Sequence, residues 1–138
     1  MTVRLNPYLS FGNEARQAME FYQSVFGGEL AVSTFAEFGM ADDPPEADKV
    51  MHSMLEAPNG LVLMGADTPS NMEYVAPAGV SISLSGDDEA ALRGYWEALS
   101  ASGTVAEPLE VAPWGDAFGM CVDRYGVTWM VNIAGPGA

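Results

Sequence analysis

The chain of 138 residues is poor in the residue types on which many protein classes depend, with one cysteine, one histidine and one lysine. A single cysteine excludes an intramolecular disulfide, and the apolar run around Cys121 favours a small buried side chain over a reactive thiol. No apolar run approaches the roughly 18 residues of a membrane-spanning helix. The sequence also lacks a phosphate-binding loop, a dinucleotide fingerprint, a CxxC pair and a serine nucleophile elbow, which argues against those particular classes.

Positive charge is nearly missing. Five basic residues stand against 19 acidic ones, which gives a formal net charge of −14. Such a surface repels phosphate backbones and anionic lipids, so we expect neither nucleic-acid nor membrane partners. The charge favours a solvated acidic surface that keeps the protein soluble, and the alternative is steering of cations towards a site. The first residues show no signal-peptide pattern, and we expect a cytoplasmic protein.

What the chain does have is an internal repeat and enough apolar residues, 49%, to build a core. Residues 9–30 and 82–105 share one pattern: a strand, a glycine with a polar residue, an amphipathic helix, and a glycine before a new strand. An aromatic pair follows nine residues after the first glycine in both copies. A unit of roughly 65 to 75 residues buries its own apolar face poorly, so we expect the two copies to share a sheet or a core.

Alternation of apolar and polar residues places the strands. Over residues 5–11, the apolar side chains fall on one face and Asn6, Tyr8 and Ser10 fall on the other. A helix follows, with Asn13 as its expected cap. Further strands are predicted over residues 29–38, 50–56 and 61–66 in the first copy and over 80–84, 104–110, 118–123 and 127–133 in the second.

These elements predict an α+β fold of two βαβββ modules, residues 1–70 and 71–138, in one compact domain. We expect a curved mixed sheet around a cleft, with the helices on the outer face. The strand faces turned away from the helices carry the candidate ligand-binding residues Asn6, Tyr8, Ser10, Ser81, Ser83, Met130 and Asn132. Their mixed polarity suits a small-molecule pocket. The alternative is a sheet surface that is solvated or packed in a dimer.

His52 is the one candidate for acid–base chemistry near neutral pH, because histidine is the residue type that exchanges protons there. It lies in the predicted strand 50–56 and shares a face with Glu56 if alternation holds, which would let the carboxylate orient the ring as a general base. The alternative is a histidine packed against a neighbouring strand with both ring nitrogens hydrogen-bonded.

Trp114 follows Pro113 in a predicted loop, where it has no periodic apolar partners. Loops carry binding groups, and an indole there can cover an apolar ligand, so Trp114 is a candidate ligand-binding residue. It can equally plug the end of the sheet or lie across a dimer interface. Trp129 falls on the apolar face of the last strand and is expected in the core. Residues 123–126 are expected to form a hairpin turn.

Three segments carry a family resemblance: NPYLSFGN at residues 6–13, AMEFYQSVFGG at 18–28, and WGDAFGMCVDRYGVTWMVNI at 114–133. With the paired βαβββ pattern, they resemble the vicinal-oxygen-chelate superfamily of glyoxalase I, extradiol dioxygenases and bleomycin-resistance proteins. The last segment is similar to the branch associated with phosphonate operons and labelled demethylubiquinone methyltransferase-like. The resemblance covers essentially the whole chain and implies a fold that hosts many chemistries.

Metal-using members of that superfamily place histidine, glutamate or glutamine at four strand positions around a divalent ion. The matching positions here fall on Asn6, near Met64, between Gly79 and Ser81, and on Met130. They offer neither imidazole nor carboxylate, whereas such an ion needs several nitrogen or oxygen donors. We therefore expect no metal and no cofactor, and Met64 joins the candidate ligand-binding residues.

The methyltransferase label is not supported by the residues. A methyl transferase usually builds its cofactor pocket on a glycine-rich strand-to-helix turn, whereas Gly27-Gly28 follows a helix.

The leading functional prediction is a metal-free small-molecule-binding protein, similar in its mode of action to resistance proteins that sequester a drug between protomers. Whether any reaction is catalysed stays open, and the alternative is an isomerase or lyase that uses His52 or a different metal arrangement. A third possibility is an interaction domain whose sheet face has no cavity. Members of the superfamily commonly dimerise, so the resemblance also implies a homodimer.

Overall fold

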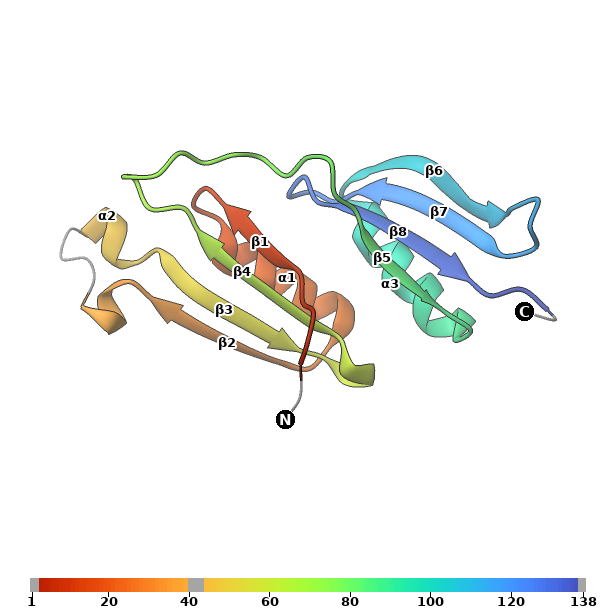
Figure 1. Ribbon diagram of the computed structural model, residues 1–138, viewed down its shortest axis with the longest axis horizontal. Helices are drawn as coiled ribbons and strands as arrows, with labels where there is room; N and C mark the ends of the chain where they lie inside the picture. The colour runs from red at the N-terminus through yellow and green to blue at the C-terminus, as the bar shows by residue number, and fades with distance from the viewer. Residues whose placement is uncertain (1–2, 40–43, 137–138) are drawn as a thin grey trace. The chain divides into compact units, whose positions relative to one another are not determined.

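The computed structural model describes residues 3–39 and 44–136, which belong to two compact units divided between Ala76 and Pro77 (Figure 1). The first unit holds β1 (Tyr8–Phe11), α1 (Ala15–Phe26), β2 (Glu29–Thr34), the 3₁₀ turn η1 (Ala36–Phe38), α2 (Pro44–Ala47), β3 (Val50–Glu56), the 3₁₀ turn η2 (Pro58–Gly60) and β4 (Val62–Asp67). The second holds β5 (Ile82–Gly86), α3 (Glu89–Ala101), β6 (Thr104–Val111), β7 (Ala117–Val122) and β8 (Thr128–Ile133). The predicted α+β class and the two βαβββ modules are confirmed.

Both units use the same strand order. The sheet of the first unit runs β1-β4-β3-β2 and that of the second runs β5-β8-β7-β6. In each, the first strand pairs in parallel with the last, and the remaining pairs are antiparallel. This repeated order is the spatial form of the pattern seen twice in the sequence.

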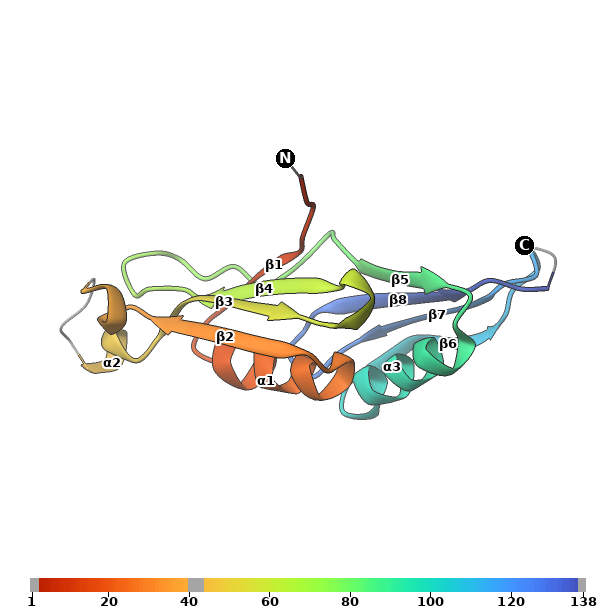
Figure 2. The ribbon, with the colours of Figure 1, turned by 90° about the horizontal axis from the view of Figure 1, so that it is seen from below.

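One long helix covers one face of each sheet, α1 in the first unit and α3 in the second (Figure 2). The apolar residues of α1 recur at helical spacing and are buried against its sheet: Ala15, Ala18, Met19, Tyr22 and Phe26. In α3 the buried positions are Leu92, Trp96 and Leu99. Over residues 3–39 and 44–136, no helix combines the length and apolar character needed to cross a membrane.

Two predicted strand boundaries were wrong by three residues or more, and the strand predicted over 80–84 lies two residues later, as β5. The first strand was expected from residue 5, but β1 begins at Tyr8 and the Leu5 side chain is fully exposed. Pro7 stands just before β1, and it has no N–H to donate to a ladder, although its carbonyl accepts a hydrogen bond from the Met64 N–H. The strand predicted over 29–38 ends at Thr34, which pairs with Val50 at the start of β3, and the chain then turns into η1.

The helix-facing side of the second sheet contains the expected core residues. Trp129 is 2% exposed and Cys121 is completely buried. Residues 123–126 form the predicted turn, in which the Gly126 N–H donates to the Asp123 carbonyl at 3.0 Å and Gly126 has a φ of 87°. Positive φ is the conformation for which glycine is favoured.

Burial makes the Cys121 thiol a poor nucleophile, since it raises the pKa from an ordinary 9.0 to about 11, with a smaller contribution from the negative charge of Asp123. At pH 8 the native thiol should react with Ellman's reagent at least about 100-fold more slowly than the thiol of the chain unfolded in guanidinium. The folded state also keeps a proton that the unfolded state loses between about pH 9 and 11, so stability falls as the pH rises through this window. Cys121→Ala should lack this part of the alkaline loss. Equal thiol reactivity in native and unfolded protein would contradict the assignment.

Candidate functional site

The face of the first sheet opposite α1 includes six residues that are here called the first open face: Tyr8, Ser10, His52, Met54, Met64 and Ala66. Tyr8 lies opposite Met64, and Met64 lies opposite Met54, so these three form one row across β1, β4 and β3. In the neighbouring row Ser10 lies opposite Ala66. Cross-strand partners share a face, and each of these side chains keeps some solvent exposure. The fold therefore brings together the predicted residues Tyr8, Ser10 and Met64.

Tyr8 and His52 form a pair across this face. The tyrosine hydroxyl lies 3.0 Å from His52 Nδ1, and the two rings stack with centroids 5.7 Å apart. Burial raises the pKa of Tyr8, so the phenol keeps its proton at neutral pH and can donate to Nδ1. A neutral His52 ring that accepts at Nδ1 carries its own proton on Nε2. The pair thus holds the imidazole in position, and the tautomer of the ring sets which of the two groups donates.

Glu56 does not take the role expected for it. It lies on the same strand face as His52 but four residues further along β3, which corresponds to about 13 Å. Its cross-strand partners are Glu29 and Val62. The predicted contact between His52 and Glu56 is therefore not formed, because alternation predicts a shared face but not adjacency. Tyr8, which comes from a distant strand, is the residue that orients His52.

The face of the second sheet opposite α3 carries a comparable set, here called the second open face: Ser83, Phe118, Met120, Met130 and Asn132. Ser83 lies opposite Met130, which lies opposite Met120, and Asn132 lies opposite Phe118. The fold therefore brings together the predicted residues Ser83, Met130 and Asn132 on one face. Two further predicted residues, Ser81 and Asn6, lie just before β5 and β1 rather than within the strands.

Asp116 anchors one end of the second open face. Its carboxylate accepts hydrogen bonds from Asn132 Nδ2 at 3.0 Å and from the Gly135 N–H at 2.8 Å. These bonds, that from Asn132 first, lower the pKa of Asp116, so the group stays ionised at neutral pH. The amide of Asn132 is thereby held in one orientation.

Trp114 stands at the same end. Its side chain is 64% exposed, and its ring meets the ring of Phe118 edge-on with centroids 6.0 Å apart. Since Phe118 lies on the second open face, the indole is placed beside that face rather than buried as a plug within its own unit. Its position fits the predicted cover for an apolar ligand, and it fits equally the predicted dimer contact.

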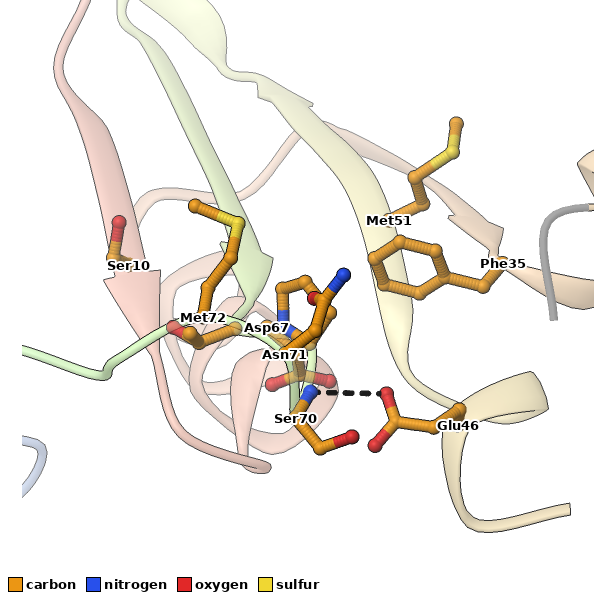
Figure 3. Close-up of a pocket in the computed structure, with 10 residues that line it drawn as sticks. Ser10, Phe35, Glu46, Met51, Asp67, Ser70, Asn71 and Met72 are labelled. Carbon is orange, nitrogen blue, oxygen red and sulfur yellow. Dashed lines mark hydrogen bonds between the residues drawn. The ribbon is translucent and has the colours of Figure 1, made fainter. Parts of the chain in front are cut away.

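A cavity of about 700 Å³ lies at the end of the first sheet, here called the end cavity. Figure 3 shows Ser10 and Met72 on one side of it, Phe35 and Met51 on the other, and Asn71 between them. Of the residues predicted from sequence, Ser10 lines it. Met51 was missed because its bulge breaks the two-residue period, Phe35 because it lies beyond the end of β2, and Met72 because it lies in irregular chain.

The residues at the superfamily's metal positions do not fit a divalent ion. Asn6 offers one amide, Met64 and Met130 offer thioethers, and the stretch from Gly79 to Ser81 offers a hydroxyl. Within residues 3–39 and 44–136, no group of three or more His, Cys, Asp or Glu side chains is placed to hold a metal. Hard cations prefer several oxygen ligands, and the d-block ions of this superfamily prefer imidazole or carboxylate.

Comparison with known proteins finds a family model, a curated relative and solved structures that match this chain. The family model described as 3-demethylubiquinone-9 3-methyltransferase matches residues 3–132. Protein YjdN from Escherichia coli (strain K12) is 24% identical over 140 residues, with 94% of each chain covered. The crystal structure of protein PA1353 from Pseudomonas aeruginosa shares 35% identity and a TM-score of 0.80, over 96% of this chain and 98% of that one.

A more distant structure shows how widely the fold is shared. A glyoxylase/bleomycin resistance protein/dioxygenase domain from Frankia sp. EAN1pec reaches a TM-score of 0.69 at 12% identity, over 100% of this chain and 96% of that one. At this identity the likeness concerns the fold and not the chemistry.

Proposed function

Because this chain belongs to the 3-demethylubiquinone-9 3-methyltransferase family, within the glyoxalase/bleomycin-resistance/dioxygenase superfamily, we propose that it is a small-molecule-binding protein that uses no metal. The observation that carries the proposal is the first open face. It combines the thioethers of Met54 and Met64 with an oriented hydrogen-bonding pair, Tyr8 and His52. Small-molecule sites have this composition, mostly apolar with a few fixed polar groups.

The Tyr8–His52 bond also indicates what the ligand offers. When Tyr8 donates to Nδ1, the ring presents an N–H at Nε2, and the ligand group that we propose for this arrangement is a hydrogen-bond acceptor such as a carbonyl or an ether oxygen. The net charge of −14 favours neutral or cationic ligands over anions. We also propose a homodimer, in keeping with the superfamily. Light scattering that finds only a 14.6 kDa monomer would refute this part.

Binding is tested by a thermal-shift screen with bleomycin and a panel of neutral and cationic aromatic compounds. A ligand present at 100 times its Kd should stabilise the protein by about 2.7 kcal/mol and raise the Tm by several degrees. For such a ligand, Tyr8→Phe should weaken binding roughly fivefold, because the His52 ring is no longer held in place by Tyr8 and its ordering on binding costs about 1 kcal/mol, while the aromatic ring at position 8 is kept. Ser24→Ala, an exposed substitution on α1 at the opposite face, is the matched control and should bind normally.

Two results would count against the proposal. The first is the absence of a shift from every compound in the panel. The second is stoichiometric metal found by elemental analysis in protein purified without chelator, since the residues at the metal positions would then have been misjudged.

A second candidate function is an isomerase or a lyase, and the same Tyr8–His52 pair favours it because a held imidazole is a common acid–base group. As a base, His52 would need its proton on Nδ1, with the Tyr8 oxygen accepting the bond. A His52→Ala variant separates the two functions. Loss of turnover of a bound compound with unchanged affinity supports the enzyme, whereas a loss of affinity alone supports the binding protein.

A further inference from the structure

The end cavity is a preformed hollow of the size that small molecules occupy. Its volume of about 700 Å³ falls within the range of about 300 to 1,000 Å³ that is typical of ligand pockets. It adjoins the first open face through Ser10, which belongs to both. A ligand on that face can therefore extend into the cavity.

A β-bulge builds one wall of the cavity. Ser33 pairs with His52 and Thr34 pairs with Val50, so Met51 is an extra residue in β3. A bulge bends its strand and redirects the side chain that it adds. Phe35 follows β2 directly and is fixed by its N–H, which donates to the Lys49 carbonyl at 3.1 Å. The wall thus presents a thioether and an aromatic ring, both suited to an apolar ligand.

The opposite wall is the segment 68–72, which hydrogen bonds hold in place. The Thr68 N–H and hydroxyl both donate to the Phe11 carbonyl, at 2.7 and 2.8 Å. Lys49 Nζ donates to the Thr68 carbonyl at 2.9 Å, and the Ser70 N–H donates to Glu46 Oε2 at 3.3 Å (Figure 3). Because the wall is already ordered, little conformational entropy is lost when a ligand binds. Met72 ends this wall with its side chain 63% exposed.

The charged side chains that line the cavity are the carboxylates of Asp67 and Glu46, and both are already paired. Asp67 accepts hydrogen bonds from the Ala15 and Val50 N–H groups, both at 2.9 Å. Glu46 accepts the bond from the Ser70 N–H and lies 3.4 Å from Lys49 Nζ, and a hydrogen bond with the Ser70 side chain is the largest cause of its lowered pKa. Among the described residues that line the cavity there is no Lys, Arg or His. An anion entering it would meet carboxylates and no cation in the lining.

From these walls and charges, we propose that the end cavity binds the aromatic body of a neutral or cationic ligand and excludes anionic ligands. Ser10 and Asn71 supply the uncharged hydrogen-bonding groups, and Phe35, Met51 and Met72 supply the apolar contact. This inference rests on the proposed function, because it names the charge class of the ligand and the place where it lies in the first unit.

The methionines make the test direct, since they mark each candidate surface separately. Met51 and Met72 line the end cavity, Met54 and Met64 lie on the first open face, and Met120 and Met130 lie on the second. Full-length protein labelled with ¹³C at the methionine methyl groups is titrated with three probes that share one ring system: 1-naphthalenemethanol, 1-naphthylmethylamine and 1-naphthoate. Met51→Leu and Met72→Leu assign the two cavity signals.

The neutral and cationic probes should shift the signals of Met51 and Met72, and the anionic probe should bind at least about tenfold more weakly. Met72→Lys, at an exposed position, adds a cation to the wall and should therefore make naphthoate bind more tightly than the neutral and cationic probes. The matched control Met120→Lys, on the second open face, should leave the relative affinities of the three probes unchanged.

Several outcomes would overturn the inference. The first is binding of naphthoate to the wild type that equals or exceeds that of the neutral and cationic probes. The second is the absence of any shift of Met51 or Met72 with any probe. The third is a set of relative probe affinities that Met72→Lys leaves unaltered. Shifts confined to Met54 and Met64, or to Met120 and Met130, would show that the ligand does not bind in the end cavity but would still agree with the proposed function. Failure of the proposed function is read separately, from the thermal-shift screen.

Discussion

Replacement of Asp123 by alanine is expected to destabilise the second unit by about 3 to 5 kcal/mol. The carboxylate is 3% exposed and accepts three hydrogen bonds, from the Tyr125 N–H at 2.8 Å, the Val127 N–H at 3.1 Å and Trp129 Nε1 at 2.8 Å. The substitution takes this acceptor from all three donors at once. It also leaves a small void beside Trp129, which is 2% exposed.

Urea unfolding followed by tryptophan fluorescence measures this loss directly. Asp123→Asn keeps one oxygen acceptor and should fall between the wild type and the alanine variant. The matched control is Asp87→Ala, which removes an exposed carboxylate just before α3 and should stay within about 0.5 kcal/mol of the wild type. A stability of Asp123→Ala equal to that of this control would show that the carboxylate does not hold the turn.

Gly28→Ala is expected to cost at least about 3 kcal/mol, since strain and collision act together. Gly28 has a φ of 90°, and a Cβ built on it would lie 2.1 Å from the Glu56 carbonyl oxygen and 2.6 Å from Ala57 Cα. Both neighbouring atoms belong to the backbone, so a side-chain movement cannot relieve the contact. The substitution should therefore disrupt the pairing of β2 with the end of β3, where Glu29 pairs with Glu56.

Gly126 provides the matched comparison. Its φ is 87°, nearly that of Gly28, but within the part of the chain that the structure describes a Cβ there would meet nothing within 4 Å. Gly126→Ala should consequently show the conformational strain alone, about 1 kcal/mol. Circular dichroism during thermal unfolding compares the two variants. If their Tm values fall by the same amount, the collision at Gly28 is relieved by a backbone movement and the expected difference is wrong.

The parts of the fold that the sequence predicts well are those in which one face of an element is buried. The period of β8 shows that Trp129 and Val131 face α3 and that Met130 and Asn132 do not, and the structure has them so. The apolar stripe of α1 is predicted for the same reason. A buried face constrains every second or every third to fourth residue, and that constraint is visible in a single sequence.

The features that escaped prediction depend on contacts between distant segments. The Tyr8–His52 bond joins residues 44 positions apart, and Asp67 reaches the start of α1 across 52 positions. Whether such groups meet is decided by strand order and register, which local patterns do not specify. The bulge at Met51 is of the same kind, because it exists only relative to the pairing of β3 with β2.

The buried thiol of Cys121 makes this chain convenient for site-directed spectroscopy. With the one native sulfhydryl buried and unreactive, a cysteine introduced at an exposed position such as Val111 or Val75 becomes the sole site for a maleimide dye or a nitroxide. A doubly substituted protein would carry one such reporter on each unit without any change to the core. Pulsed electron resonance or energy transfer could then follow, in solution, how the separation between the two halves responds to each compound added.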